Sequence, residues 1–309
     1  MTTVQPRAIG TAVTRLDGPA KVTGTATYAF EYPVDAPLYL HPVQATIAKG
    51  TVTAMDTYAA EALDGVEAVL TVFNAPTLAD TDDGDLVILQ DDQVHYRGQL
   101  IGAVVADSAE NARQAAALVT VAYDEVEHDT EIRADHPGLY APEEVNSGHE
   151  TDTADGDVET ALRHAAVTVD QTYTTPHEHN NPMEPHATIA TWDPDGALLT
   201  LYDSTQGVHV VRKTLAQTFG LEPEQIRVVA KNVGGGFGSK GSPHSHNVLA
   251  VMAAQQVPGR PVKLAVTRQQ MFAFVGYRTP TIQHVRLGVL LDGGGLLDDV
   301  AHDVRRRRP

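Results

Sequence analysis

The glycine-rich segment Gly234-Gly235-Gly236-Phe237-Gly238-Ser239-Lys240, the glycine loop, constrains this chain more than any other part of its sequence. Each glycine loses more conformational freedom on folding than another residue would, so a cluster of them is costly to order. Bare backbone in such a loop can approach a ligand closely, and successive N–H groups can bind an anion. The loop follows a strand-like run at 226–230 and precedes an apolar helical run at 248–256. The pattern predicts either a tight structural turn or a ligand-binding loop.

Two familiar phosphate-binding patterns do not describe the loop. The P-loop pattern requires glycine at the position of Ser239. A dinucleotide fingerprint matches formally as Gly236-x-Gly238-x-x-Gly241, but the next strand, 262–267, ends without an acidic residue to bind a ribose. Nucleotide binding is therefore disfavoured, while a structural turn and another kind of ligand site both stay open.

A second polar cluster lies at 176–186, with the sequence PHEHNNPMEPH. Three histidines and two glutamates in so short a run invite a metal site. Prolines interrupt the run, however, and prevent the helical HExxH arrangement. The favoured interpretation is a polar corner held by hydrogen bonds, formed by His177, Glu178, His179, Glu184 and His186.

The segment Asp203-Ser204-Thr205-Gln206-Gly207 marks the end of a strand and the start of a helix. Open α/β sheets present side chains to ligands at such places. Ser204 or Thr205 is expected to cap the helix. Gln206 is not explained by capping, because a glutamine amide contributes little there.

Composition limits the classes of partner. The chain has 309 residues, which predicts about two domains, and a formal net charge of −18 at pH 7. That charge argues against nucleic acid and anionic membrane surfaces as partners. The chain contains no cysteine, which excludes disulfides, iron–sulfur ligation and cysteine-bound zinc within it. No leader or apolar run of membrane-spanning length is recognised, so a cytoplasmic protein is expected.

The apolar pattern predicts a mixed α/β chain of the α+β class. A strand is expected at 38–47, with Pro42 marking an edge or a bulge. A strand–helix–strand unit across 100–123 is expected to form a right-handed crossover in one mixed sheet. In the second half, a hairpin is expected at 187–202 and a helix at 207–219.

Several motifs in a fixed order together resemble a known family. The chain is similar to the molybdopterin-binding large subunit of the xanthine dehydrogenase and aldehyde oxidoreductase family, from about Gly10 to Arg286. The motifs that carry the resemblance are residues 10–28, residues 98–106, NPMEPH at 181–186, DSTQG at 203–207, GGGFGSK at 234–240 and GRPVKLAVTR at 259–268.

The resemblance implies a domain order. An α/β hammerhead domain is expected at 10–130 and a linker at 131–157. The N-terminal portion of the molybdopterin-binding domain follows at 158–288, and a divergent tail occupies 289–309. Large subunits of the family are much longer than this chain, and the resemblance therefore implies a truncated member.

The resemblance also implies a reaction, hydroxylation of an aldehyde or an N-heterocycle with oxygen derived from water. The cofactor would be molybdenum–molybdopterin, with the cytosine dinucleotide form as one candidate. The pterin dithiolene would hold the metal, so no protein ligand to a metal is expected. Electrons would pass to 2Fe-2S and FAD centres on partner subunits of a hetero-oligomer, which agrees with the lack of cysteine here. Export together with such a subunit is the one route to the periplasm that we consider.

The family's site residues carry over to particular positions. Gln206 would donate a hydrogen bond to an oxygen ligand of the molybdenum. Phe237 and Gly241 would line the substrate pocket, and Gly241 stands where purine-oxidising members often have an acidic residue, which favours aldehydes or another substrate. The remaining cofactor contacts are expected from the loop, at Gly235, Gly236, Phe237 and Gly238.

The family's general base, a glutamate in a late Gly-Glu motif, has no counterpart in this chain. From Val289 the family pattern fades, and the sequence ends in Arg305 to Pro309, which suggests an interrupted reading frame or a fragment boundary. We therefore expect the chain alone to be inactive. Two alternatives stay open: a non-catalytic protein that docks the partner subunits, and a metallohydrolase that uses His177, His179 and His186.

Overall fold

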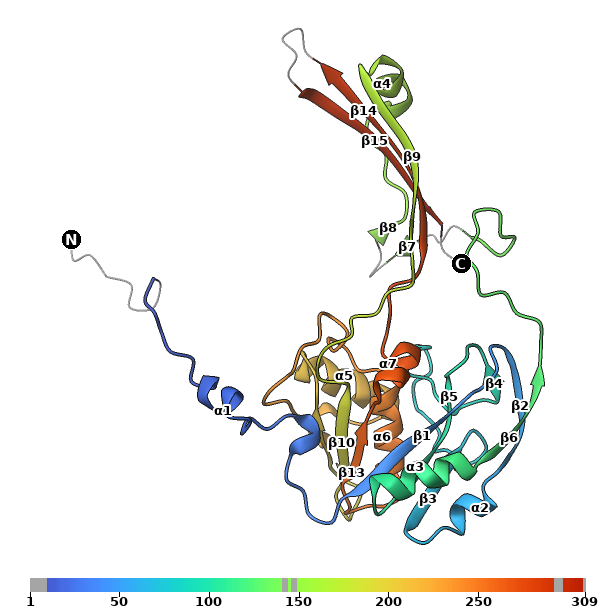
Figure 1. The fold of residues 1–309 in the computed structure, drawn as a ribbon, viewed down its shortest axis with the longest axis vertical. Coiled ribbons are helices and arrows are strands. Elements are labelled where there is room, and N and C mark those ends of the chain that lie inside the picture. The colour runs from blue at the N-terminus through green and yellow to red at the C-terminus, as the bar shows by residue number, and fades with distance from the viewer. Residues whose placement is uncertain (1–9, 141–143, 146–148, 292–296, 308–309) are drawn as a thin grey trace. The chain divides into compact units, whose positions relative to one another are not determined.

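The computed structural model describes residues 10–140, 144–145, 149–291 and 297–307 (Figure 1). By contacts, the chain forms two compact units. The larger unit combines 1–127 with 180–276, and the smaller combines 128–179 with 277–309. Within the described residues, no helix has both the length and the apolar composition that crossing a membrane requires.

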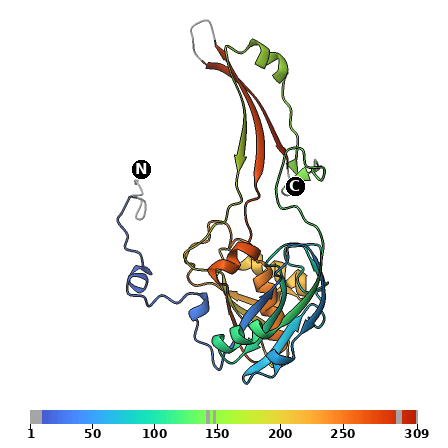
Figure 2. The same cartoon turned by 45° about the vertical axis from the view of Figure 1, so that its right-hand side comes forward.

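The larger unit is built on a seven-stranded mixed sheet with the order β12-β11-β10-β13-β1-β5-β3. Figure 1 labels β10, β13, β1, β5 and β3 of this sheet, and Figure 2 shows the same ribbon turned by 45°. The pairs β1/β13 and β11/β12 are parallel, and the other neighbours are antiparallel. The strands are β1 Leu38–Gln44, β3 Val66–Thr71, β5 Leu100–Ala106, β10 Ala187–Trp192, β11 Leu199–Asp203, β12 Ile226–Val229 and β13 Val262–Ala265.

Helices cover both faces of this sheet at β5. Val104 packs in a cluster with Ala60 and Ala115, which belong to α2 and α3. Ala103 and Val105 belong instead to the main core, together with the residues of α6. Successive residues of a strand face opposite sides, so β5 is enclosed from both. The helices of this unit are α1 Gly18–Val22, α2 Tyr58–Glu61, α3 Ala109–Leu118, α5 Val208–Phe219, α6 Ser245–Gln255 and α7 Arg268–Phe274, with short 3₁₀ turns at Ala29–Glu31 and Pro223–Gln225.

The predicted hairpin and the helix after it are confirmed. β10 and β11 pair antiparallel on either side of the turn that begins at Asp193, whose carboxylate accepts a hydrogen bond from Ala197 N at 2.7 Å. α5 ends at Gly220, which has a left-handed backbone with φ 65°. Both features depend on turn and cap chemistry that is local in sequence.

Pro42 lies in an inner strand, so its prediction as an edge residue is wrong. β1 pairs with β13 only at Leu38 and Tyr39, and Pro42 lies beyond the end of that ladder. The expected bulge is present, because the β1/β5 register shifts between Val43 and Gln44. A proline is tolerated here since no neighbour on the β13 side requires its missing N–H.

The predicted crossover within one sheet is also wrong. β5 belongs to the seven-stranded sheet, whereas β6 (Thr120–Glu125) pairs with β2 (Gly50–Asp56) in a separate three-stranded sheet that also includes β4 (Gln93–Val94). α3 therefore connects two sheets. The local pattern predicts the elements correctly but does not specify which strand each one pairs with.

The smaller unit contains a three-stranded antiparallel sheet with the order β15-β14-β9. Arg286 of β14 forms an ion pair with Glu159 of α4 at 2.7 Å, and Gly288 lies close beneath Leu162 of the same helix. Residues 292–296 and 308–309 of the expected tail lie outside the described residues, and the predicted domain boundaries stay predictions. The elements are α4 Val158–His164, β9 Val167–Thr175, β14 Thr281–Leu291 and β15 Leu297–Arg307, with a two-stranded sheet of β7 Glu144–Val145 and β8 His149–Glu150.

Candidate functional site

The glycine loop has an unusual backbone. Phe237 adopts φ 55°, a left-handed conformation that a bulky residue rarely takes, and Gly235 and Gly238 both have φ 95°. Such a backbone costs on the order of 1–3 kcal/mol at a non-glycine residue and persists where its surroundings hold it. The Phe237 side chain is 71% exposed, so its own packing does not explain the conformation. Within the loop, Ser239 N donates a hydrogen bond to Gly236 O at 2.9 Å and closes a turn around Phe237, and contacts from outside the loop add to this support.

Gln206 is one of these contacts. Its side-chain Oε1 accepts a hydrogen bond from Gly238 N at 3.1 Å, and its backbone N donates to Lys240 O at 2.8 Å. A Cβ on Gly236 would lie 2.3 Å from Gln206 Oε1, so bare backbone at Gly236 is what lets Gln206 approach. The structure thus brings Gln206 against the loop. Because an N–H can donate only to the amide oxygen, the orientation of the Gln206 amide is set.

Several hydrogen-bond donors of the loop have no acceptor among the residues that the structure describes. Within the described part of the chain, no acceptor lies on the backbone N–H groups of Gly235, Gly236 and Phe237 or on the Gln206 side-chain Nε2. Gln206 is exposed, and a Cβ on Gly238 would meet open space. Neighbouring free N–H groups form a concavity that suits an electron-rich ligand. The residues present therefore fit a ligand rich in hydrogen-bond acceptor atoms, which agrees with the cofactor that the resemblance implies.

A buried ion pair closes the base of the loop. Glu184 Oε2 accepts hydrogen bonds from Gly234 N at 2.7 Å and from Lys240 Nζ at 2.8 Å. Lys240 Nζ also donates to the Glu184 carbonyl oxygen at 2.9 Å. The side chain of Lys240 is 0% exposed, and burial lowers its pKa while Glu184 opposes that shift. Glu184 was predicted only as part of a polar corner, and the pairing with Lys240 was not foreseen.

Three imidazoles surround the end of the loop, the buried His186 and His246 and the half-buried His244. The Ser239 carbonyl oxygen accepts from His186 Nε2 at 3.0 Å and from His244 Nε2 at 2.6 Å, because a carbonyl can only accept. The ring of His186 also packs edge-on against His246. Burial lowers the pKa of His186 to about 3, and that of His246 well below its usual value. His186 and His246 are therefore neutral near neutral pH, and His186 carries its proton on Nε2, which donates to Ser239 O.

The metallohydrolase alternative required His177, His179 and His186 around one ion. The rings of His177 and His179 stack on each other with centroids 4.7 Å apart, and His177 also packs on Tyr277 at 4.1 Å. His186 packs against His244 and forms a hydrogen bond with the glycine loop instead. Among the described residues, no group of three or more His, Asp or Glu side chains is placed to hold a metal ion.

The predicted caps at Ser204 and Thr205 are wrong, because α5 has Gly207 as its N-cap residue. The Ser204 hydroxyl accepts from Ala187 N at 2.9 Å, and the Thr205 hydroxyl donates to Lys240 O at 3.0 Å. Both hydroxyls thus connect the strand end to neighbouring segments. The helix begins two residues later than a Thr205 cap would require and three residues later than a Ser204 cap would require.

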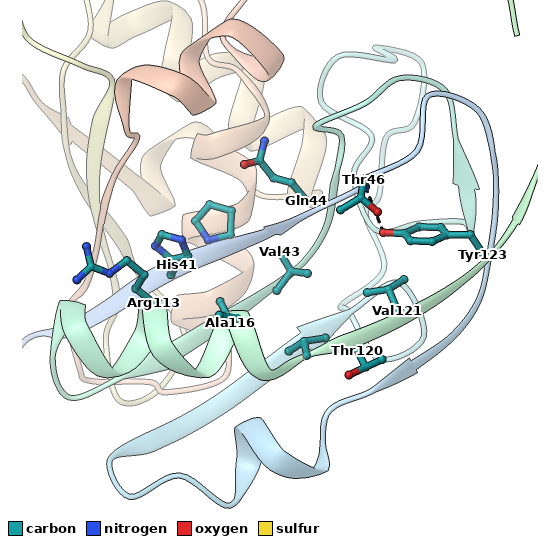
Figure 3. A pocket seen from close by; sticks show the side chains of 12 residues that line it. His41, Val43, Gln44, Thr46, Arg113, Ala116, Thr120, Val121 and Tyr123 are labelled. Atoms are coloured by element: carbon teal, nitrogen blue, oxygen red, sulfur yellow. Dashed lines mark hydrogen bonds between the residues drawn. The ribbon is translucent and has the colours of Figure 1, made fainter.

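A separate groove lies between α3, β1 and β6, with a volume of about 520 Å³ (Figure 3). His41 and Arg113 lie at one end, and Tyr123, whose hydroxyl accepts from Thr46 N at 3.3 Å, lies at the other. None of the residues predicted as site residues lines it. The lining residues are His41, Pro42, Val43, Gln44, Thr46, Arg113, Ala116, Ala117, Val119, Thr120, Val121 and Tyr123.

Comparison with known families identifies two domains in this chain. A model of the molybdopterin cofactor-binding domain matches residues 140–298, just over half of the chain. This chain belongs to the molybdopterin-binding subunits of the xanthine dehydrogenase and aldehyde oxidoreductase family. The a/b hammerhead domain of aldehyde oxidase and xanthine dehydrogenase matches residues 23–127. The family predicted from the order of the motifs is confirmed, as are the mixed α/β class and its two named domains.

Individual relatives are much longer than this chain. It is 38% identical to the aldehyde oxidoreductase molybdenum-binding subunit PaoC of Escherichia coli (strain K12), over 97% of this chain and 40% of that protein. It is 28% identical to the nicotinate dehydrogenase large molybdopterin subunit of Eubacterium barkeri, over 93% of this chain and 68% of that one. The chain therefore spans about two fifths of the first relative's length and about two thirds of the second's.

Solved structures show the same fold. The aldehyde oxidoreductase of Desulfovibrio gigas matches with a TM-score of 0.72 at 29% identity, over 89% of this chain and 32% of that one. The quinoline 2-oxidoreductase of Pseudomonas putida 86 matches with a TM-score of 0.78 at 24% identity, over 92% of this chain and 38% of that chain. The second likeness concerns the fold alone.

Proposed function

We propose that this chain supplies part of the cofactor site of a molybdenum hydroxylase. The observation that carries the proposal is the set of unused donors beside Gln206, on the backbone of Gly235, Gly236 and Phe237. When bound, the molybdenum–molybdopterin cofactor supplies the two-electron chemistry that adds a water-derived oxygen to a substrate carbon. The chain's own residues bind the cofactor and orient it.

The proposed roles follow from what each group can donate. The loop N–H groups hold the cofactor through its electron-rich atoms. Gln206, its orientation set by Gly238 N, donates from its free Nε2 to an oxygen ligand of the metal. Phe237 presents an exposed ring where a substrate would lie, and a Cβ on Gly241 would meet only Gly238 O, at 3.4 Å. These assignments are proposals that mutation can test.

An aldehyde is the substrate class we favour. Gly241 follows the loop lysine in the sequence and carries no carboxylate. The site therefore lacks an acidic group at position 241 to bind the polar edge of a purine. Two of the relatives described above are named as aldehyde oxidoreductases, which supports the same choice. We further propose the cytosine dinucleotide form of the pterin, 2Fe-2S and FAD partner subunits in a hetero-oligomer, and a cytoplasmic location.

We propose that the chain alone does not turn over substrate. Loss of a general base typically costs 10²–10⁴-fold in rate, and we expect that base to come from sequence outside this chain. We expect the remaining contacts to the pterin, like the base, to come from sequence outside this chain. The cofactor is therefore expected to bind weakly here. Partner docking without catalysis remains the alternative for the isolated chain.

Equilibrium uptake of the isolated cofactor tests the proposal. The full chain is dialysed anaerobically against molybdenum–molybdopterin, and molybdenum and pterin are measured in the protein compartment. We expect matched uptake of both by the wild type and a reduced uptake by Gln206→Ala, with no aldehyde oxidation by either. Lys231→Ala, at an exposed position before the loop, is the control. Uptake by the wild type no greater than that of an unrelated acidic protein rejects the cofactor site, and turnover by the lone chain rejects its inactivity.

A further inference from the structure

We propose that Glu184 and Lys240 are a positioning pair that holds the glycine loop in its cofactor-binding conformation before the cofactor arrives. The inference rests on the proposed function and adds two residues to it. A single carboxylate oxygen, Glu184 Oε2, takes hydrogen bonds from the first residue of the loop, Gly234, and from the last, Lys240. Both ends of the loop are thereby tied to one atom.

The burial of the pair makes the tie specific. The Lys240 side chain is 0% exposed and that of Glu184 is 14% exposed, so water is a poor substitute for either partner. Removing one partner would leave the other charge buried and uncompensated, which is strongly unfavourable. The arrangement with both ends joined is therefore strongly preferred to one in which the lysine turns away.

Gly234 is part of the same device. A Cβ at this position would lie 2.5 Å from Glu184 Cβ, so only a glycine lets the carboxylate reach the backbone N–H. The contact with Glu184 thus explains why position 234 is a glycine, although this residue faces the ion pair and not the ligand. The pair uses the N–H of Gly234 and leaves those of Gly235, Gly236 and Phe237 free for the cofactor.

Other contacts hold the loop near its last residues, from His186, His244 and Thr205, and two more hold its middle. Asn180 Nδ2 donates to Phe237 O at 2.6 Å, and Gln206 Oε1 accepts from Gly238 N. Neither contact spans the loop from end to end. Among the described residues, only the Glu184–Lys240 pair joins the two ends of the glycine loop. Its loss should loosen the whole loop without disturbing α6, the helix that follows.

Hydrogen exchange on the full cofactor-free chain measures this directly. The amides to follow are Gly238, Ser239 and Gly241, each of which is hydrogen-bonded in the structure. In Glu184→Gln we expect them to exchange about tenfold faster or more, with α6 unchanged. The matched control is Glu67→Gln, which removes the charge of Glu67 from its exposed ion pair with Arg260 in the same unit. This variant should leave the exchange rates of the loop amides unchanged.

A double variant separates positioning from stability, since a single variant can fail to fold. Glu184→Leu combined with Lys240→Met replaces the pair with apolar side chains of similar size, which commonly preserves stability. We expect a thermal midpoint close to that of the wild type, fast loop exchange and about tenfold weaker cofactor uptake. Conversely, Glu67→Gln should bind the cofactor as the wild type does.

The outcomes are distinguishable. Wild-type loop exchange in a folded double variant would overturn the proposal, because the pair would then not hold the loop. Fast exchange with unchanged cofactor uptake would overturn the link to binding. If the wild type takes up no cofactor, the proposed function fails, whereas the exchange data still decide whether the pair holds the loop.

Discussion

Asn247 Nδ2 donates a hydrogen bond to Asp203 Oδ1 over 2.9 Å, joining the helix after the glycine loop to the strand that ends just before Gln206. The same nitrogen lies 2.9 Å from Thr188 Oγ1, whose hydroxyl also donates to Asp203. Three elements, β10, β11 and α6, thus meet at one carboxyl group. Burial raises the pKa of Asp203 to about 6, although these hydrogen bonds oppose the shift.

Asp203→Asn should change how stability depends on pH. The pKa of Asp203 is about 6 in the folded chain, against an ordinary value of 3.8, so the folded state holds this proton more tightly than the unfolded state. The contribution of Asp203 to the free energy of unfolding is therefore largest at low pH and falls as pH rises through this window, by about 3 kcal/mol in all. Asn cannot ionise, so the Asp203→Asn variant does not lose this part of its stability as pH rises.

Urea unfolding of both proteins between about pH 4 and pH 7 measures the effect. The stability of Asp203→Asn relative to the wild type should increase with pH. A difference that stays constant across the range would show that Asp203 titrates normally.

His186→Gln should change the pH dependence of stability in the opposite direction from Asp203→Asn. The pKa of His186 is about 3 in the folded chain, lowered from 6.5 chiefly by burial, with small contributions from His244, Lys240 and Arg268. Below pH 6.5 the unfolded chain takes up this proton and the folded chain does not, so stability is lost as pH falls, by about 2 kcal/mol at pH 5. Gln can still donate to Ser239 O and does not titrate.

Chemical denaturation at pH 7 and pH 5 tests this prediction. The wild type should lose more stability between the two values than His186→Gln does. His209→Gln, on the exposed side of α5, is the matched control and should behave like the wild type. Equal losses in the wild type and His186→Gln would contradict the argument.

Gly236→Ala should weaken cofactor binding without straining the backbone. The new methyl group would lie 2.3 Å from Gln206 Oε1, and this exposed side chain can swing away at little cost. Its bond to Gly238 N is then lost, and we expect cofactor uptake to fall about tenfold with a small change in thermal midpoint.

Gly238→Ala gives the contrasting case. Its Cβ would meet open space, but φ 95° is unfavourable for alanine, so this variant should lose on the order of 1–2 kcal/mol of stability. Thermal melts and equilibrium dialysis on both variants separate the two effects. The interpretation fails if Gly236→Ala binds the cofactor as the wild type does.

Leu201→Ala should destabilise the floor of the site. Leu201 is 0% exposed on β11, two residues before Asp203, and belongs to the main core. Leu-to-Ala changes in such places cost about 2–5 kcal/mol. Leu198→Ala, at a 53% exposed position in the same hairpin, should change the free energy of unfolding by less than about 0.5 kcal/mol. Urea titrations of the two variants give the comparison, and similar values would refute the assignment of the core.

Sequence reasoning succeeded where the chemistry is local. The turn at Asp193 and the stop at Gly220 follow from side-chain and backbone preferences within a few residues. The approach of Gln206 to the glycine loop was predicted from the family resemblance, and the structure brings the two together. The roles of these residues in cofactor binding stay predictions.

What escaped prediction depends on contacts far apart in the sequence. Glu184 and Lys240 are separated by 56 positions, and neither neighbourhood indicates that the other is its partner. A lysine next to a run of glycines is an available signal, since an isolated cation there needs a counter-charge once buried. Pro42 is the converse case: its position inside the sheet is tolerated only because the β13 ladder ends at Tyr39.

The parallel pairing of β1 with β13 has a consequence for dissecting this protein. It places strands from the hammerhead match beside strands from the molybdopterin-binding match, and Leu38 and Leu264 share one core. Severing the chain near residue 127 would expose an unpaired strand edge and a bare apolar surface on both pieces. The hammerhead match and the 180–276 part of the molybdopterin-binding match therefore share one compact unit, and we expect either half expressed by itself to aggregate.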